Sequence, residues 1–270
     1  MRKAFALVAL FCQGCVPLPP ATEGAPGRLA QTDAGFTTHS TRHFEVRAYS
    51  ESAAREAGEL AERLLERVAR DAGLYSLRTA APITVFLYRS QEEFSAKTDI
   101  PPGAATGASD RSGTLFSFEG APLRNVLSHE LGHRVFDEAV GRADPLWVNE
   151  GLAVYEEQEA SQDPAAYPMG DRVIPLRDMA GLEAAQRVAL VSQQDLRPAG
   201  LPRREEPMSA WHRQVGGVVR LMIEKGGSGE FARFLAAMRD GRTEDEAIGI
   251  AFRGRWKGMA DLEARWRTGS

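Results

Sequence analysis

The sequence that constrains this fold most strongly is LRNVLSHELGHRVF, residues 123–136. Pro122 stands just before it, and proline is favoured at the first positions of a helix. Gly141 follows it, and glycine is favoured immediately after a helix ends. We therefore expect a single helix to run from about residue 123 to residue 140.

This stretch contains the pattern H-E-x-x-H. On a helix, His129 and His133 are one turn apart, so both imidazoles project from one face and can occupy two corners of a tetrahedral zinc site. Glu130 lies beside them, placed to contact a metal-bound water rather than the metal. Gly132 has no side chain, which would let another element pack close behind the ligand pair. The alternative is an amphipathic helix that exposes two histidines to solvent.

A third ligand is expected on the next helix, which opens after Pro145 and carries Glu150, 17 residues beyond His133. Two imidazoles and one carboxylate, with the fourth position open, make the kind of zinc site that a hydrolase needs. The apolar neighbours Trp147 and Leu152 predict that this helix is buried, and an unpaired glutamate there would be costly. A surface glutamate near a turn is the alternative.

The N-terminus has the pattern of an export signal. Arg2 and Lys3 precede nine apolar residues, 4–12, which are too few to span a bilayer, so we expect residues 1–15 to be a signal peptide. The Gly14-Cys15 junction resembles a bacterial lipoprotein cleavage site, and a lipidated Cys15 would anchor the chain to a membrane. We expect an exported protein, periplasmic or on the cell surface, whether anchored or free.

The remaining chain is expected to form one α+β domain. Residues 16–38 are rich in proline and glycine and predict a flexible linker. Within residues 39–268, strands are expected at 43–49, 83–88 and 114–118. A helix capped by either Ser50 or Ser52 is expected to end at Gly73. Residues 39–160 would hold the sheet and both metal helices, and residues 161–268 would be mostly helical. We expect a loop at 98–113, and residues 115–118 to be either an edge strand that binds an extended substrate or an interior strand.

Composition and cysteine content limit what this protein can be. Of the 270 residues, 43% are hydrophobic and 26% are charged, and the net charge is -4, so the basic surplus of a nucleic-acid binder is absent. The two cysteines, Cys12 and Cys15, both fall in the predicted signal. We therefore expect no disulfide in the folded domain.

The motif His129-Glu130-Leu131-Gly132-His133, followed by Trp147-Val148-Asn149-Glu150-Gly151-Leu152-Ala153, resembles the gluzincin metallopeptidases, and among them the bacterial peptidase MA-like proteins. The resemblance covers most of residues 39–268. It implies that His129, His133 and Glu150 bind one Zn²⁺ ion and that Glu130 is the catalytic base. It also implies a small twisted sheet packed on the H-E-x-x-H helix, followed by a helical subdomain.

Two positions depart from the family pattern. Val154 stands where thermolysin-like members often have an aspartate that orients a zinc histidine, so Asp137, Glu156 or a backbone carbonyl would have to do this. His212 stands where the family often has a tyrosine that stabilises the oxyanion. His212 is therefore either a catalytic donor or an exposed helix histidine, and Tyr155 is either a second candidate donor or core packing.

The function expected from these features is that of an exported zinc metallopeptidase, which hydrolyses peptide bonds in peptide or protein substrates through a zinc-bound water activated by Glu130. Two alternatives remain. One is an exported zinc-binding scaffold protein without turnover, and the other is an amidase that acts on cell-wall peptides.

Overall fold

The structure is a computed structural model that describes residues 35–75, 81–103, 105–110, 112–141, 145–161, 176 and 207–268. The predicted signal peptide, its Cys15 and most of the predicted linker lie outside the described residues. Within the described part of the chain, no helix is both long enough and apolar enough to cross a membrane.

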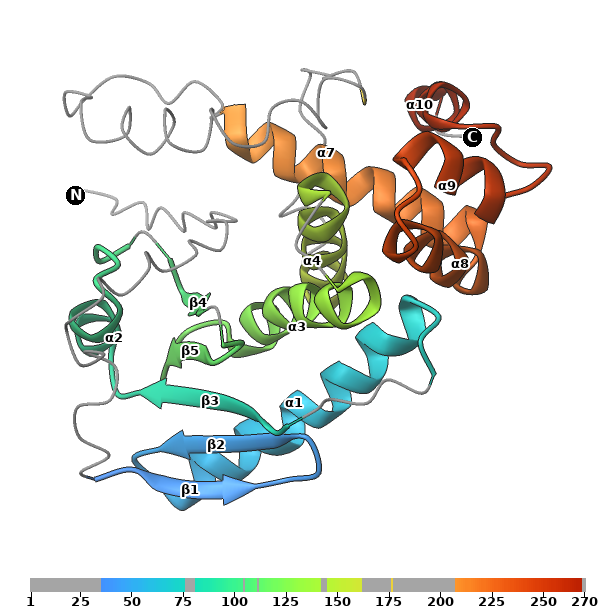
Figure 1. Ribbon diagram of the computed structural model, residues 1–270. Helices are drawn as coiled ribbons and strands as arrows, with labels where there is room; N and C mark the ends of the chain where they lie inside the picture. The colour runs from blue at the N-terminus through green and yellow to red at the C-terminus, as the bar shows by residue number, and fades with distance from the viewer. Residues whose placement is uncertain are drawn as a thin grey trace, which may run out of the picture.

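The domain combines one open five-stranded sheet with helices (Figure 1). The strands are β1 (Thr37–Ser40), β2 (Phe44–Ala48), β3 (Ile83–Tyr88), β4 (Gly107–Ser109) and β5 (Leu115–Phe118), arranged in the order β1-β2-β3-β5-β4. The three central strands β2, β3 and β5 are parallel, and the two edge strands pair antiparallel to their neighbours. The predicted α+β class is thus confirmed.

The parallel pair β2 and β3 is connected by α1 (Glu51–Asp71), a helix capped by the side chain of Ser50, which accepts from the amide of Ala53. Alternation in β2 buries Phe44, Val46 and Ala48 against this helix and its neighbours. The opposite face of the sheet contributes Phe116 and Phe118 to a second apolar cluster, together with Phe94 of α2 (Gln91–Thr98). The sheet therefore separates two apolar layers.

Helix α3 (Leu123–Val140) carries the H-E-x-x-H motif and ends, as predicted, with Gly141 in the left-handed conformation at φ 79°. It packs on the sheet through β4 and β5, on α1, and on α4 (Leu146–Ala160). Beyond α4, the chain continues with α7 (Pro207–Leu221), a π-helical turn (Met222–Gly226), α8 (Ser228–Arg239), α9 (Glu244–Ala251) and α10 (Met259–Thr268). Figure 1 shows α3 between the sheet and the pair α4 and α7.

The helical part and the sheet part share one hydrophobic core. A continuous cluster of buried residues extends from Phe44 on β2, through Leu131 on α3 and Trp147 on α4, to Phe234 on α8. Helices α3 and α4 thus lie in the middle of the domain, with packed side chains on both sides.

Two sequence-based predictions need correction. The short strand β4 lies inside the stretch 98–113, which we predicted to be a loop. That prediction was wrong because Gly107, Ala108 and Ser109 have weak strand propensity and gave no strand pattern. A Cβ atom at Gly107 would lie 2.2 Å from Cγ1 of Val126, so its absence allows α3 to approach this edge strand. Because β4 occupies the edge, the strand at residues 115–118 is interior, and its edge alternative is wrong.

The start of the folded region also differs from the predicted boundary at residue 39. Strand β1 begins at Thr37 and pairs with β2. The ring of Phe36 stacks on that of Tyr49 at a centroid distance of 4.5 Å. Pairing and stacking order these residues despite the proline- and glycine-rich composition before them.

The contact between α3 and α4 depends on Gly132. A Cβ atom there would lie 2.6 Å from the Cα and 2.9 Å from the backbone nitrogen of Ala153. A methyl group at this position therefore cannot be accommodated unless the two helices move apart. The predicted close packing behind the ligand pair is confirmed.

We expect Gly132→Ala to lower the free energy of unfolding by about 1–3 kcal/mol, because it overpacks a helix contact that is made by backbone atoms. Urea denaturation measures this value. Gly229→Ala on α8 is the matched control, since a Cβ there meets no atom within 4 Å, and it should leave stability unchanged or raise it by up to about 1 kcal/mol. Equal stabilities of Gly132→Ala and the wild type would contradict the close approach.

Candidate metal centre

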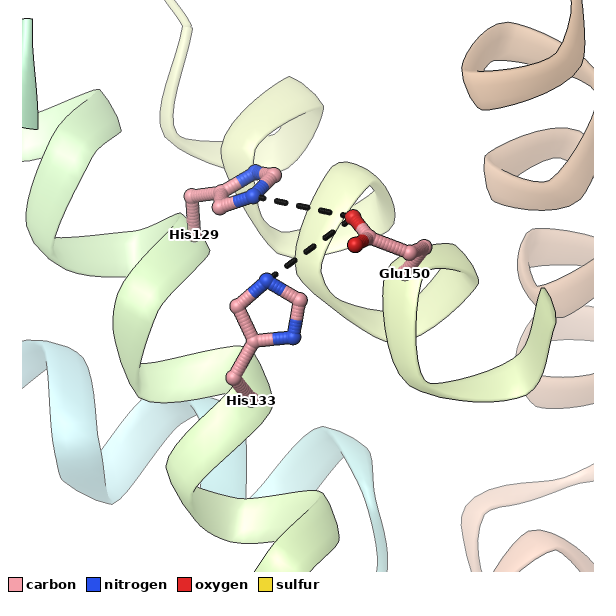
Figure 2. Close-up of side chains that lie close together, drawn as sticks. All are labelled: His129, His133 and Glu150. Carbon is pink, nitrogen blue, oxygen red and sulfur yellow. Dashed lines mark ion pairs between the residues drawn. The ribbon is translucent and has the colours of Figure 1, made fainter. Parts of the chain in front are cut away.

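The two histidines of the motif project from one face of α3, as their spacing predicts (Figure 2). Their ring centroids lie 4.9 Å apart and the rings are nearly perpendicular, at 81°. The side chains of His129 and His133 are only 8% and 15% exposed. The alternative of two solvent-exposed histidines is therefore wrong.

Glu150 reaches the pair from α4 and is 2% exposed. Its Oε2 atom lies 4.0 Å from Nε2 of His129 and 3.8 Å from Nε2 of His133. One ligand atom from each of the three residues lies within 4.8 Å of the others. Neighbouring ligand atoms in a tetrahedral zinc site are about 3.3 Å apart, given bonds of about 2.0 Å, so a small inward shift of these side chains would close around an ion.

Each imidazole is fixed by a polar partner on α4. Nδ1 of His129 lies 3.0 Å from Oε2 of Glu157, and Nδ1 of His133 lies 2.7 Å from Oδ1 of Asn149. Because both acceptors take a proton from Nδ1, a neutral ring at either position carries its lone pair on Nε2, which faces the centre. Both Nε2 atoms are buried and have no hydrogen-bond partner among the described residues. These residues therefore fit a metal ion.

The acceptors predicted to orient these imidazoles were wrong, because Glu157 and Asn149 contact their Nδ1 atoms in place of Asp137, Glu156 or a backbone carbonyl. A signal for both was present in the sequence. Asn149 directly precedes Glu150, and Glu157 follows it by seven residues, or about two helical turns, which brings it to the same face of α4.

The charges around the centre favour a cation. Burial lowers the pKa of His129, but the hydrogen bond and charge of Glu157, with the charges of Glu130 and Glu150, raise it to about 9. Burial also raises the pKa of Glu150, yet the imidazoles of His133, His212 and His129 hold it well below its ordinary value. Carboxylates that favour a proton on an imidazole favour a metal cation at the same place.

The two other predicted site residues are also buried. Glu130 is 3% exposed and lies close enough to His129 to raise its pKa. His212, on α7, is 4% exposed, and its Nε2 lies 3.6 Å from Oε2 of Glu150, so the alternative of an exposed helix histidine is wrong. Tyr155 belongs to the hydrophobic core and lies under the guanidinium of Arg220, which agrees with its packing alternative.

Among the described residues, His129, His133 and Glu150 are the one group of histidine, cysteine and acidic side chains whose geometry could hold a metal ion. Comparisons with protein-family models, with curated proteins and with solved structures find no match to this chain.

We expect Glu157→Ala to weaken zinc binding by about 10–100-fold, because it removes the acceptor that orients His129. Competition titration against a chelating dye measures the affinity. Glu159→Ala is the matched control on the same helix, since the carboxylate of Glu159 pairs with Arg220 at 2.8 Å and its side chain is 38% exposed. Equal zinc affinities for the two variants would show that the Glu157 contact does not support the site.

A second prediction concerns Glu156, which is fully buried beside Arg67. Burial raises its pKa from 4.5 to about 8, Arg67 opposes this rise, and Asp71 and Glu159 add to it. The folded carboxyl group therefore holds its proton between about pH 4.5 and pH 8, where the unfolded one has lost it. In this window the free energy of unfolding should fall as pH rises, by up to about 1.4 kcal/mol per pH unit.

Urea denaturation with a chelator present, at several pH values across this window, measures the fall. Glu156→Gln should show a shallower fall than the wild type, because it lacks the titrating group. Parallel pH dependences of the two proteins would contradict the raised pKa of Glu156.

Proposed function

We propose that this chain is a zinc-dependent peptidase of the gluzincin type. The observation that carries the proposal is the convergence of His129, His133 and Glu150 in a buried centre with both Nε2 atoms turned inward. A divalent ion with three protein ligands keeps a position open for a reactant, which is the arrangement of catalytic rather than structural zinc.

A zinc ion supplies Lewis-acid chemistry when bound, since it lowers the pKa of water towards about 7 and polarises a carbonyl oxygen. Glu130 acts as the general base, accepting a proton from the attacking water and returning it to the leaving amine. Its position next to His129 on α3, with a side chain 3% exposed, suits this role. A buried carboxylate in a dry site keeps its full electrostatic effect on a nearby proton.

His212 is the proposed donor to the carbonyl oxygen that becomes negatively charged as water attacks. It approaches the centre from α7, a different helix from those of the metal ligands. A donor held on a separate buried element is positioned before the reaction begins, so it needs no reorganisation when charge develops.

A non-catalytic zinc protein is the second candidate. His212 lies 3.6 Å from Glu150, and as a fourth ligand it would close the site and leave no position for a reactant. The set of ligand atoms within 4.8 Å of one another contains His129, His133 and Glu150 but not His212. We therefore prefer the open site. His212→Ala should retain zinc if the site is open and lose it if His212 is a ligand.

Peptides or proteins are the proposed substrates. The alternative is that the chain hydrolyses the amide bonds of cell-wall peptides. Export to the periplasm or cell surface is part of the proposal and rests on residues 1–15, as does membrane anchoring through Cys15. Casein, a peptide library and peptidoglycan fragments, each tested with and without chelator, distinguish these substrates.

The decisive variant is Glu130→Gln, which removes the base but keeps the size of the side chain. It should bind one zinc ion per chain by elemental analysis and lose cleavage by about 100-fold or more. Glu138→Gln is the matched control on the same helix, because Glu138 pairs with Arg134 at 2.5 Å and is 25% exposed. This control should cleave at the rate of the wild type.

Normal turnover by Glu130→Gln would remove Glu130 from the mechanism. Stoichiometric zinc without chelator-sensitive cleavage of any of the three substrates would support the non-catalytic zinc protein instead.

A further inference from the structure

We infer that Arg67 is a positioning residue that holds the two metal-bearing helices in register. Arg67 belongs to α1, which contributes no metal ligand, and its guanidinium reaches both α3 and α4. The inference rests on the metal site of the proposed function, although it does not require peptidase activity.

The guanidinium of Arg67, whose side chain is 22% exposed, makes four hydrogen bonds. Its Nη2 donates to Oγ of Ser128 on α3 at 3.1 Å, and to the backbone oxygen and Oε2 of Glu156 on α4 at 2.8 Å and 3.0 Å. Its Nε donates to the same Oε2 at 3.2 Å. The side chains of Ser128 and Glu156 have no solvent exposure.

Both anchor residues are next to the site in sequence. Ser128 directly precedes the ligand His129, and Glu156 directly precedes Glu157, which accepts from Nδ1 of His129. Arg67 therefore ties together the two backbone segments that bear this histidine and its orienting acceptor. A small slide of α4 along α3 would change the distance between Nδ1 of His129 and Glu157.

The bond to the backbone oxygen of Glu156 makes Arg67 more than a counter-ion. A charge pair alone leaves a helix free to shift, whereas a hydrogen bond to a main-chain carbonyl fixes a point on the helix itself. The planar fork of arginine can make these bonds in several directions at once, while lysine offers one compact ammonium. Arginine is thus suited to the contact in a way that its charge alone does not explain.

Stability is a poor explanation for this contact, because the cost of desolvating its polar groups offsets most of their attraction. We expect Arg67 to contribute mainly to the position of α4 relative to α3. Removing the guanidinium of Arg67 should allow α3 and α4 to shift relative to each other. This shift would reduce the affinity of the site for metal.

The test measures zinc affinity by competition titration on the full chain, well below the unfolding temperature of every variant. We expect Arg67→Lys, which keeps the positive charge near Glu156, to bind zinc about tenfold more weakly, and Arg67→Met to bind it more weakly still. The visible absorption of bound Co²⁺ reports the ligand geometry, and both variants should alter this spectrum. If Arg67→Met fails to fold, Arg67→Lys alone decides the test.

Arg220→Met is the matched control. Arg220 also bridges to α4, through Glu159 at 2.8 Å and Gln158 at 3.4 Å. These two contacts are to side chains and not to the main chain of α4, and Arg220 is 34% exposed. We expect its zinc affinity and Co²⁺ spectrum to equal those of the wild type.

The inference is overturned if Arg67→Lys binds zinc within about twofold of the wild type with an unchanged Co²⁺ spectrum, or if Arg220→Met weakens binding equally. A wild-type chain that binds no zinc would overturn the proposed function as well. These failures are distinguishable, since the first two outcomes leave wild-type zinc binding intact.

Discussion

The close contact between α3 and α4 is the constraint on which the site depends. At Gly132 the backbone of α4 approaches so closely that a single methyl group would collide with the backbone of Ala153. This approach brings Glu150 to within about 4 Å of two imidazoles on the other helix. It also brings Asn149 and Glu157 within hydrogen-bond distance of the same rings, so one helix contact sets both the ligands and their orientation.

A second constraint is charge, because the centre gathers acidic side chains in a buried volume. Glu130 and Glu150 are 3% and 2% exposed, and the carboxylate of Glu157 is 15% exposed. Buried carboxylates are tolerated where a cation or a donor compensates them. A proton on the imidazole of His129 can do so, as its raised pKa indicates, and a divalent ion would do so with its charge concentrated between the three side chains.

Much of this arrangement could be predicted from local sequence patterns. The spacing of His129 and His133 determines their shared face on a helix. The pattern of apolar residues predicted α1, β2 and β3, and Pro122 and Gly141 predicted the ends of α3. Strand β4 could not be predicted this way, because its glycine, alanine and serine have weak strand propensity. The close approach of α3 explains the glycine at position 107. The hydrogen bonds of Arg67 to Ser128 and Glu156 were not predicted either. They join Arg67 to residues 61 and 89 positions further along the chain, and they depend on how three helices pack.

The central claim is that one metal ion binds between α3 and α4. Anomalous diffraction at the zinc absorption edge, from crystals grown with zinc, tests it most directly. We expect one strong peak about 2.0–2.2 Å from Nε2 of His129, Nε2 of His133 and the carboxylate of Glu150. The absence of a peak there, with the Glu150 carboxylate turned away from the imidazoles, would contradict it.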